Sequence, residues 1–281
     1  MRSSSAAVGT TTAGRAGGSL RCSVVLDDSR SPEHRAGEPV RGGIPEHGRV
    51  PRYYEVKAGL LALVQEMEEG ALLPPERELA ERYGVSRVTL RQAVGELVLE
   101  GKLQRRQGSR TAVAPPKLVQ PLALVSYTEG VRRQGREPGR TLITAESLPA
   151  DPGLAADLRI EPAGEVLHLE RVLLADGERI GLESTYLPAA RFSGLLEEFS
   201  PDASLYEFLR TRHGVVFAEA RERVETVLAT PREALLIGTG PSLPMMLMHR
   251  VSQDAAGVPI ERVRSLYRGD RFSFETCLRA D

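Results

Sequence analysis

Several features that define other protein classes are scarce in this 281-residue sequence. Its two cysteines, Cys22 and Cys277, are too few for a disulfide framework and lack the spacing of a zinc site. No run of about 18 apolar residues occurs, and no apolar segment follows the arginines near the N-terminus. We therefore expect a soluble, cytoplasmic protein with no membrane span, no signal peptide, no membrane partner and no metal.

A strong net charge and a catalytic motif are missing as well. The formal net charge of −1 argues against an electrostatic clamp on nucleic acid that uses the whole chain, so any DNA binding must use a local basic patch. No nucleophile motif is present, and the histidines show no metal-ligand spacing. These are His34, His47, His168, His213 and His249. We therefore predict that the protein is not an enzyme and needs no cofactor.

The chain is long enough for two domains of ordinary size, and its composition suggests where they begin. Residues 1–50 are rich in Gly, Ser, Thr, Ala, Pro and Arg, which predicts a disordered extension. Two alternatives for this segment are a DNA-scanning basic arm and a start codon assigned too early. Its seven arginines against five acidic residues give only a small basic excess, which weighs against the arm. The paired prolines in 114–121 predict a linker.

The stretch 73–113 carries the clearest local pattern. A first short helix is predicted to start at Pro75 and to end at Gly84, and Ser86 is placed to cap a second helix that stops at Gly101. A preceding helix over 53–69 has apolar residues at helical spacing and reads as core. The pattern predicts a helix-turn-helix.

The exposed residues of this pattern suit DNA. The first turn of the second helix leaves Arg87, Thr89 and Arg91 free, and such side chains bind phosphates and purine edges. A basic strand, turn and strand follow between Lys102 and Lys117 with no acidic residue. A small helical domain with a solvated charge run is the alternative. The order of caps, polar turn and basic wing favours a winged helix-turn-helix.

The segment 74–108, PPERELAERYGVSRVTLRQAVGELVLEGKLQRRQG, resembles the DNA-binding domain of the GntR family of bacterial regulators. The wing departs from the family pattern Gly-x-Gly-Thr-Phe-Val, because Arg110 stands where the second glycine is usual. We predict that Arg110 turns toward the minor groove or a flanking phosphate. The residues expected to bind a double-stranded operator are Arg77, Ser86, Arg87, Thr89, Arg91, Gln107, Gly108 and Arg110.

From Leu122 onward, short helices alternate with hairpins, which predicts an α+β domain with a mainly antiparallel sheet. This region resembles the UTRA ligand-sensing domain of the HutC branch of GntR regulators, which has a chorismate-lyase-like fold. The motifs that carry the resemblance are Ser126-Tyr127-Thr128-Glu129, Leu174-Ala175-Asp176-Gly177-Glu178 and the run 265–271, SLYRGDR. Within that branch the chain is similar to regulators of amino-sugar use, which respond to phosphorylated sugars.

The candidate effector pocket combines strand periodicity with that resemblance. Glu261 and Tyr267 share one face of the last long strand, where a carboxylate could accept hydrogen bonds from ligand hydroxyls or an amine and an aromatic ring could stack on a sugar. Without the resemblance, an ordinary solvated sheet face is the simpler interpretation. The expected pocket residues are Ser126, Tyr127, Thr128, Arg171, Glu183, Ser204, Glu261 and Tyr267.

Two details of this pocket make testable expectations. Arg171 and Glu183 lie on one face only if the hairpin between them carries an extra residue, so we predict a three-residue loop, 175–177, with Gly177 left-handed. Sugar-phosphate sensors of this branch usually carry a second arginine two residues after the first, and Leu173 stands there instead. We therefore expect a sugar-like or amino-sugar-like effector held mainly through hydroxyls, although a sugar phosphate stays possible.

These observations predict a dimeric repressor that reads an inverted repeat and leaves it when a small metabolite binds. The predicted parts are the extension 1–50, the winged helix-turn-helix 51–113, the linker 114–121, and the UTRA effector-binding and dimerisation domain 122–281. An activator, or an effector other than a sugar, remains an alternative. A structural nucleoid protein is a third possibility, which the sensing domain argues against because a sequence-blind binder needs no pocket.

Overall fold

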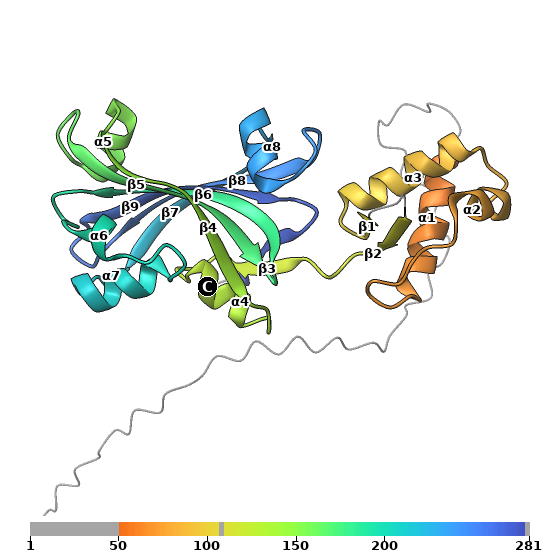
Figure 1. Cartoon of the computed structure of the whole chain (residues 1–281), viewed down its shortest axis with the longest axis horizontal. Helices are drawn as coiled ribbons and strands as arrows, with labels where there is room; N and C mark the ends of the chain where they lie inside the picture. The colour runs from red at the N-terminus through yellow and green to blue at the C-terminus, as the bar shows by residue number, and fades with distance from the viewer. Residues whose placement is uncertain (1–50, 107–109, 279–281) are drawn as a thin grey trace, which may run out of the picture. The chain divides into compact units, whose positions relative to one another are not determined.

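The computed structural model describes residues 51–106 and 110–278 (Figure 1). The predicted disordered extension, and Gln107 and Gly108 at the wing tip, lie outside the described residues. None of the helices in the described ranges is both long and apolar enough to span a bilayer.

The N-terminal part is a helix-turn-helix with a small wing. Its elements are α1 (Arg52–Gln65), α2 (Glu76–Arg82), α3 (Arg87–Leu99), β1 (Leu103–Arg106) and β2 (Arg110–Val113). The stripes of all three helices meet in one apolar cluster in which Leu60, Leu90 and Leu97 are fully buried. The predicted winged helix-turn-helix is thus confirmed. The helix predicted over 53–69 was predicted too long. The observed helix, α1, stops at Gln65, and the amide of Gly70 donates instead to the Val113 carbonyl of the wing.

The recognition helix α3 begins and ends at the residues that its sequence indicates. The Ser86 hydroxyl accepts a hydrogen bond from the Thr89 amide, which satisfies one free donor of the first turn. At the other end Gly101 has a φ of +74°, the left-handed conformation that ends a helix at little steric cost for glycine.

The C-terminal part is built on a six-stranded antiparallel sheet in the order β4-β5-β6-β9-β8-β7. The strands are β4 (Pro138–Pro149), β5 (Glu165–Ala175), β6 (Glu178–Pro188), β7 (Glu219–Leu228), β8 (Pro244–Gln253) and β9 (Pro259–Arg268). Figure 1 shows helices on both faces of this sheet. The fold class predicted from the sequence, α+β with a mainly antiparallel sheet, is therefore confirmed.

Two sets of helices cover the two faces of the sheet (Figure 1). On one face lie α4 (Tyr127–Arg132), α6 (Leu195–Glu198) and α7 (Leu205–His213), and on the other lie α5 (Pro152–Leu158) and α8 (Pro231–Ile237). On the first face, one apolar cluster gathers around Phe192, Leu195 and Leu209, and a second gathers around Tyr127 and Tyr267. The polar pocket described below opens between α4 and α7.

A second, smaller sheet is absent from the sequence prediction. It pairs β3 (Leu118–Pro121) in parallel with β10 (Phe272–Glu275), so segments from opposite ends of the domain lie side by side. Gln134, just after α4, holds β3 by accepting from the Val119 amide and donating to its carbonyl. The apolar run 123–127 forms no strand, because it turns into the N-cap of α4 at Ser126.

The hairpin of β5 and β6 corrects the predicted loop. Ala175 pairs with Glu178, and both Asp176 and Gly177 have positive φ, so the turn is a two-residue type I′ turn. The extra residue sits instead at Ile180, where the register shifts between the Leu173 and Leu174 pairs. This bulge places Arg171 and Glu183 on the same face of the sheet, as the expected three-residue loop would have done.

Candidate functional site

The first candidate surface lies on the helix-turn-helix and its wing. One hollow there is lined by Arg77 from α2, by Arg87 and Arg91 from α3, and by Arg105 and Arg110 from the wing strands. Four of these arginines were predicted from the sequence to bind DNA, and the fold brings those four together. Converging guanidinium groups on a recognition helix and wing suit both phosphates and guanine edges.

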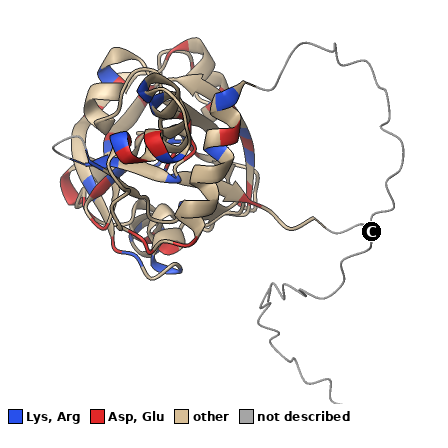
Figure 2. Cartoon of the chain, turned by 90° about the vertical axis from the view of Figure 1, so that its right-hand side faces the viewer, with Lys and Arg blue, Asp and Glu red and all other residues tan. Residues whose placement is uncertain are grey.

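Ion pairs hold two of these arginines before any DNA arrives. Nε of Arg91 lies 2.9 Å from a carboxylate oxygen of Glu76, and Nε of Arg77 lies 3.0 Å from Glu81. Figure 2, which views the chain from the right-hand side of Figure 1, shows basic and acidic residues interspersed. A carboxylate beside an exposed arginine competes with phosphate for its donors, which opposes unspecific attraction to an anionic surface.

The sequence prediction missed one exposed residue of the recognition helix. Val88 lies between Arg87 and Thr89 in the first turn of α3, and 77% of its surface is exposed. An apolar side chain at this place suits contact with a thymine methyl group. The signal was available, because Val88 falls outside the buried stripe of Leu90, Val94 and Leu97.

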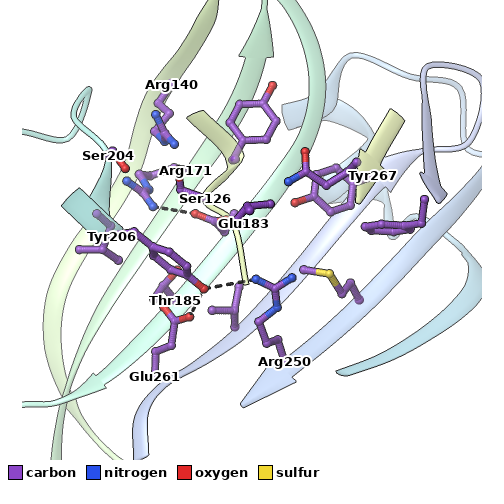
Figure 3. Close-up of a pocket in the computed structure, with 17 residues that line it drawn as sticks. Ser126, Arg140, Arg171, Glu183, Thr185, Ser204, Tyr206, Arg250, Glu261 and Tyr267 are labelled. Atoms are coloured by element: carbon purple, nitrogen blue, oxygen red, sulfur yellow. Dashed lines mark hydrogen bonds and ion pairs between the residues drawn. The ribbon is translucent and has the colours of Figure 1, made fainter. Parts of the chain in front are cut away.

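The second candidate site is a pocket on the sheet face that carries α4 and α7 (Figure 3). Side chains of β4, β5, β6, β8 and β9 form its floor, and α4, α7, β3 and β10 contribute to its walls. Its polar lining residues are Gln120, Ser126, Arg140, Arg171, Glu183, Thr185, Ser204, Tyr206, Arg250, Glu261 and Tyr267. The cavity measures about 40 Å³, which is space for a few water molecules.

Arg171 is the most buried cation of this pocket. Only 2% of its surface is exposed, its Nη2 donates to Glu183 at 2.6 Å, and its guanidinium lies 5.6 Å from the ring centre of Phe199. Arg171 and Glu183 are direct partners across the β5–β6 pair, so they share one face as predicted. Nε and Nη1 of Arg171 are buried and have no hydrogen-bond partner among the described residues.

A second arginine, Arg140 of β4, lines the same end of the pocket (Figure 3). Its Nη2 donates to the Thr128 hydroxyl at 2.8 Å, and its guanidinium lies 5.4 Å from the ring centre of Tyr127. Burial lowers the pKa of Arg140, and the positive charge of Arg171 lowers it further. The pocket thus concentrates positive charge at one end.

The other end of the pocket carries a buried carboxyl group. Glu261 is fully buried, and its Oε1 accepts hydrogen bonds from the Tyr206 hydroxyl at 2.6 Å and from the Ser252 hydroxyl at 3.0 Å. Burial raises the pKa of Glu261, although Tyr206 and Arg250 oppose that rise. Its Oε2 is buried without a partner in the described part of the chain. This atom is available to a ligand hydroxyl or amine.

Aromatic and amide side chains close the pocket. Gln120 of β3 is buried against α4, where a side chain at Gly130 would collide with it. Tyr267 stacks on Phe272, with ring centres 4.0 Å apart, and also contacts Phe274 of β10. One face of the Tyr267 ring is therefore already covered, which limits the stacking on a sugar ring that the sequence suggested.

The structure gathers most of the predicted effector residues. Seven of the eight line the pocket, and they are Ser126, Tyr127, Arg171, Glu183, Ser204, Glu261 and Tyr267. Thr128 lies in a neighbouring hollow with Ser126 and Ser204, and it contacts the pocket through Arg140. The described ranges contain no group of three His, Cys, Asp or Glu side chains able to hold a metal ion.

The residues that sequence analysis missed come from positions without a local signal. Arg140 is the third residue of β4, and Arg250 interrupts the apolar run of β8. Tyr206 lies in the first turn of α7, beside the predicted Ser204. A charged residue inside an apolar strand is the one hint that could have indicated Arg250.

Comparisons with known proteins agree with this architecture. Residues 53–113 match the family described as "Bacterial regulatory proteins, gntR family", and residues 133–273 match the UTRA domain. The chain is 45% identical over 232 residues to the transcriptional repressor PhnF of Mycolicibacterium smegmatis, covering 83% of this chain and 94% of PhnF. It is 33% identical over 234 residues to the transcriptional repressor NagR of Bacillus subtilis, covering 82% and 96%.

A solved structure shows the same arrangement of elements. The crystal structure of PhnF from Mycobacterium smegmatis matches with a TM-score of 0.60 at 46% sequence identity, covering 80% of this chain and all of that chain. The structure of the PhnF effector domain alone matches with a TM-score of 0.56, covering 58% of this chain and 99% of that one.

Proposed function

Because the chain belongs to the GntR family of bacterial regulatory proteins and, with its UTRA domain, to the HutC subfamily, we propose that it is a dimeric repressor released from its operator by a small metabolite. Members of this family are transcriptional regulators and not enzymes. A DNA-binding regulator acts where the chromosome is, which in a bacterium is the cytoplasm.

The proposed parts of the chain follow the sequence prediction. The head is 51–113, the linker is 114–121 and the effector-binding and dimerisation domain is 122–281. The extension 1–50 has no proposed role in binding DNA.

The proposal of a dimer follows from how a recognition helix reads DNA. One helix reaches only a few base pairs, so specific affinity needs two heads about one helical turn, roughly 34 Å, apart on the duplex. An inverted repeat is the operator that matches a two-fold symmetric dimer. Sedimentation of the full chain with and without a duplex bearing one half-site or two would test this, since a monomer bound to a single half-site contradicts it.

The observation that carries the effector proposal is a pair of opposed, incompletely bonded groups in one pocket. The free Nε and Nη1 of Arg171 offer donors at one end, and Oε2 of Glu261 offers an acceptor at the other. Buried polar groups without partners are rare in proteins, because each costs about 1–3 kcal/mol. A small polar metabolite with hydroxyl or amine groups, such as a sugar or amino sugar, would satisfy both ends.

Release of the repressor from its operator would follow from the small size of the cavity. Small-molecule pockets usually measure about 300–1,000 Å³, so a ligand that enters a cavity of about 40 Å³ would displace part of the wall. Gln120 belongs to that wall and lies on β3 (Leu118–Pro121), the strand formed by the last four residues of the proposed linker 114–121. Moving β3 would change where the linker leaves the domain. A ligand acts only if it favours one arrangement of the heads over the other.

Two measurements test the function as a whole. A duplex selected from random sequences by the full chain should bind Arg87→Ala more weakly by about 1–3 kcal/mol, because that arginine reads a guanine edge. A thermal-shift screen of sugars, amino sugars and their phosphates should then find compounds that also release the duplex. Wild-type DNA affinity in Arg87→Ala, or stabilising compounds that never release DNA, would contradict the proposal.

A further inference from the structure

The second arginine that β5 lacks at position 173 has a counterpart, Arg140, on the neighbouring strand β4. In the β4–β5 pair Arg140 lies directly opposite Leu173. Cross-strand partners point to the same face of a sheet, so Arg140 shares the pocket face with Leu173 and Arg171. Leu173 itself is fully buried in the apolar cluster with Tyr127 and Tyr267.

The donors of the two arginines are only partly used. Nη2 of Arg140 donates to the Thr128 hydroxyl, and Nη2 of Arg171 donates to the Glu183 carboxylate. Nε of Arg140 and both Nε and Nη1 of Arg171 are buried and unbonded within the described ranges. These atoms carry four N–H groups, because each Nε has one hydrogen and Nη1 has two.

The charges of this corner are also not balanced. Glu183 forms an ion pair with Arg171, whereas no ion pair to Arg140 occurs among the described residues. The nearest cation–π partner, Tyr127, is neutral and its hydroxyl already donates to the Leu174 carbonyl. Two neighbouring guanidinium groups with one carboxylate leave an excess positive charge in a buried place, which an anion would neutralise.

We infer that Arg140 is the second anion-binding arginine of the pocket and that it acts with Arg171 to hold a phosphoryl or phosphonyl group of the effector. The inference rests on the proposed function and narrows its ligand class. Donors that arrive from two strands reach the three terminal oxygens of a tetrahedral group better than the two coplanar oxygens of a carboxylate. Leu173 at the position of the usual second arginine therefore does not remove phosphate recognition, because Arg140 on β4 supplies a guanidinium on the same face of the sheet.

Placing an arginine at position 173 and removing the one at position 140 gives a direct test. The variants are Arg140→Leu, Arg140→Lys, Leu173→Arg and the exchange Arg140→Leu with Leu173→Arg. The matched control is Arg179→Leu, an exposed arginine of β6 outside the pocket whose side chain bonds, among the described residues, only to the Leu236 carbonyl. Calorimetry on the full chain would use inorganic phosphate and glucosamine 6-phosphate as probes, with glucosamine and acetate as the neutral and carboxylate comparisons.

We expect Arg140→Leu to weaken binding of inorganic phosphate at least tenfold and the exchange variant to restore most of it. Arg140→Lys should retain an intermediate affinity, because an ammonium keeps the charge but not the planar set of donors. Leu173→Arg alone should not bind inorganic phosphate more tightly than the wild type, since a third guanidinium would face Arg140. Arg179→Leu should bind phosphate as the wild type does.

The inference is overturned if the wild type binds neither phosphate compound, if acetate binds as well as phosphate, or if Arg140→Leu binds phosphate normally. It is also overturned if the exchange variant is folded and yet does not recover. Binding of the selected duplex without ligand, measured for every variant, separates these outcomes from failure of the proposed function. If the chain is not a DNA-binding repressor, it fails to bind the duplex whether or not Arg140 is replaced.

Discussion

Replacing Glu183 with glutamine should destabilise the effector-binding domain strongly. The substitution keeps the shape of the side chain but removes the one carboxylate that pairs with Arg171, which is 2% exposed. Breaking a buried ion pair by removing one partner costs about 3–5 kcal/mol, since the other charge is left uncompensated. The amide oxygen can still accept from Nη2, and 14% of the Glu183 side chain is exposed, so we take the lower end, about 3 kcal/mol.

That free energy predicts a clear thermal shift. For a chain of this size 1 kcal/mol lowers the melting temperature by about 2–4 °C, so Glu183→Gln should melt about 6–12 °C below the wild type. The control is Glu129→Gln, which breaks an exposed ion pair to Arg133, the C-cap of α4, and should cost less than about 0.5 kcal/mol.

The same variant should respond more strongly to an anion. Added inorganic phosphate would supply the counter-charge that Glu183 no longer gives, so it should raise the melting temperature of Glu183→Gln more than that of the wild type. The assay is differential scanning calorimetry at neutral pH, with chloride at equal ionic strength as the reference. If Glu183→Gln melts within about 2 °C of the wild type, Glu183 does not compensate Arg171 and the electrostatic account of the pocket is wrong.

Three further predictions address other parts of the molecule. Glu76→Gln should free Arg91 and raise affinity for unrelated DNA, so a competition gel shift should show poorer discrimination; unchanged discrimination would contradict a restraining role. Arg110→Gly should weaken operator binding and flatten its salt dependence, and identical titrations at two salt concentrations would mean that Arg110 contributes nothing. Burial raises the pKa of Glu261 above its ordinary value of 4.5, so the ionised carboxyl costs stability that grows as pH rises. Glu261→Gln should therefore gain stability relative to the wild type as pH rises above 4.5, and a pH-independent difference in denaturant unfolding would refute this.

The sequence by itself determined the features that depend on neighbours along the chain. Helix caps are local, because Ser86 bonds to an amide three residues away and Gly101 needs only its own backbone freedom. The period of two in a strand likewise placed Glu261 and Tyr267 on one face without knowledge of the fold. The caps and helices of the head could be predicted for this reason, whereas the pocket residues were expected because the region resembles the UTRA domain.

Only the tertiary structure decided which strands face each other and where their register shifts. The bulge at Ile180, and not the loop, aligns Arg171 with Glu183, because a one-residue shift anywhere in a hairpin has the same effect on facing. The pairing of Arg140 with Leu173, and of β3 with β10, joins residues far apart in the sequence, and no local propensity encodes such contacts. The sequence therefore showed an arginine missing from β5, while the sheet register showed that β4 supplies another at the same place.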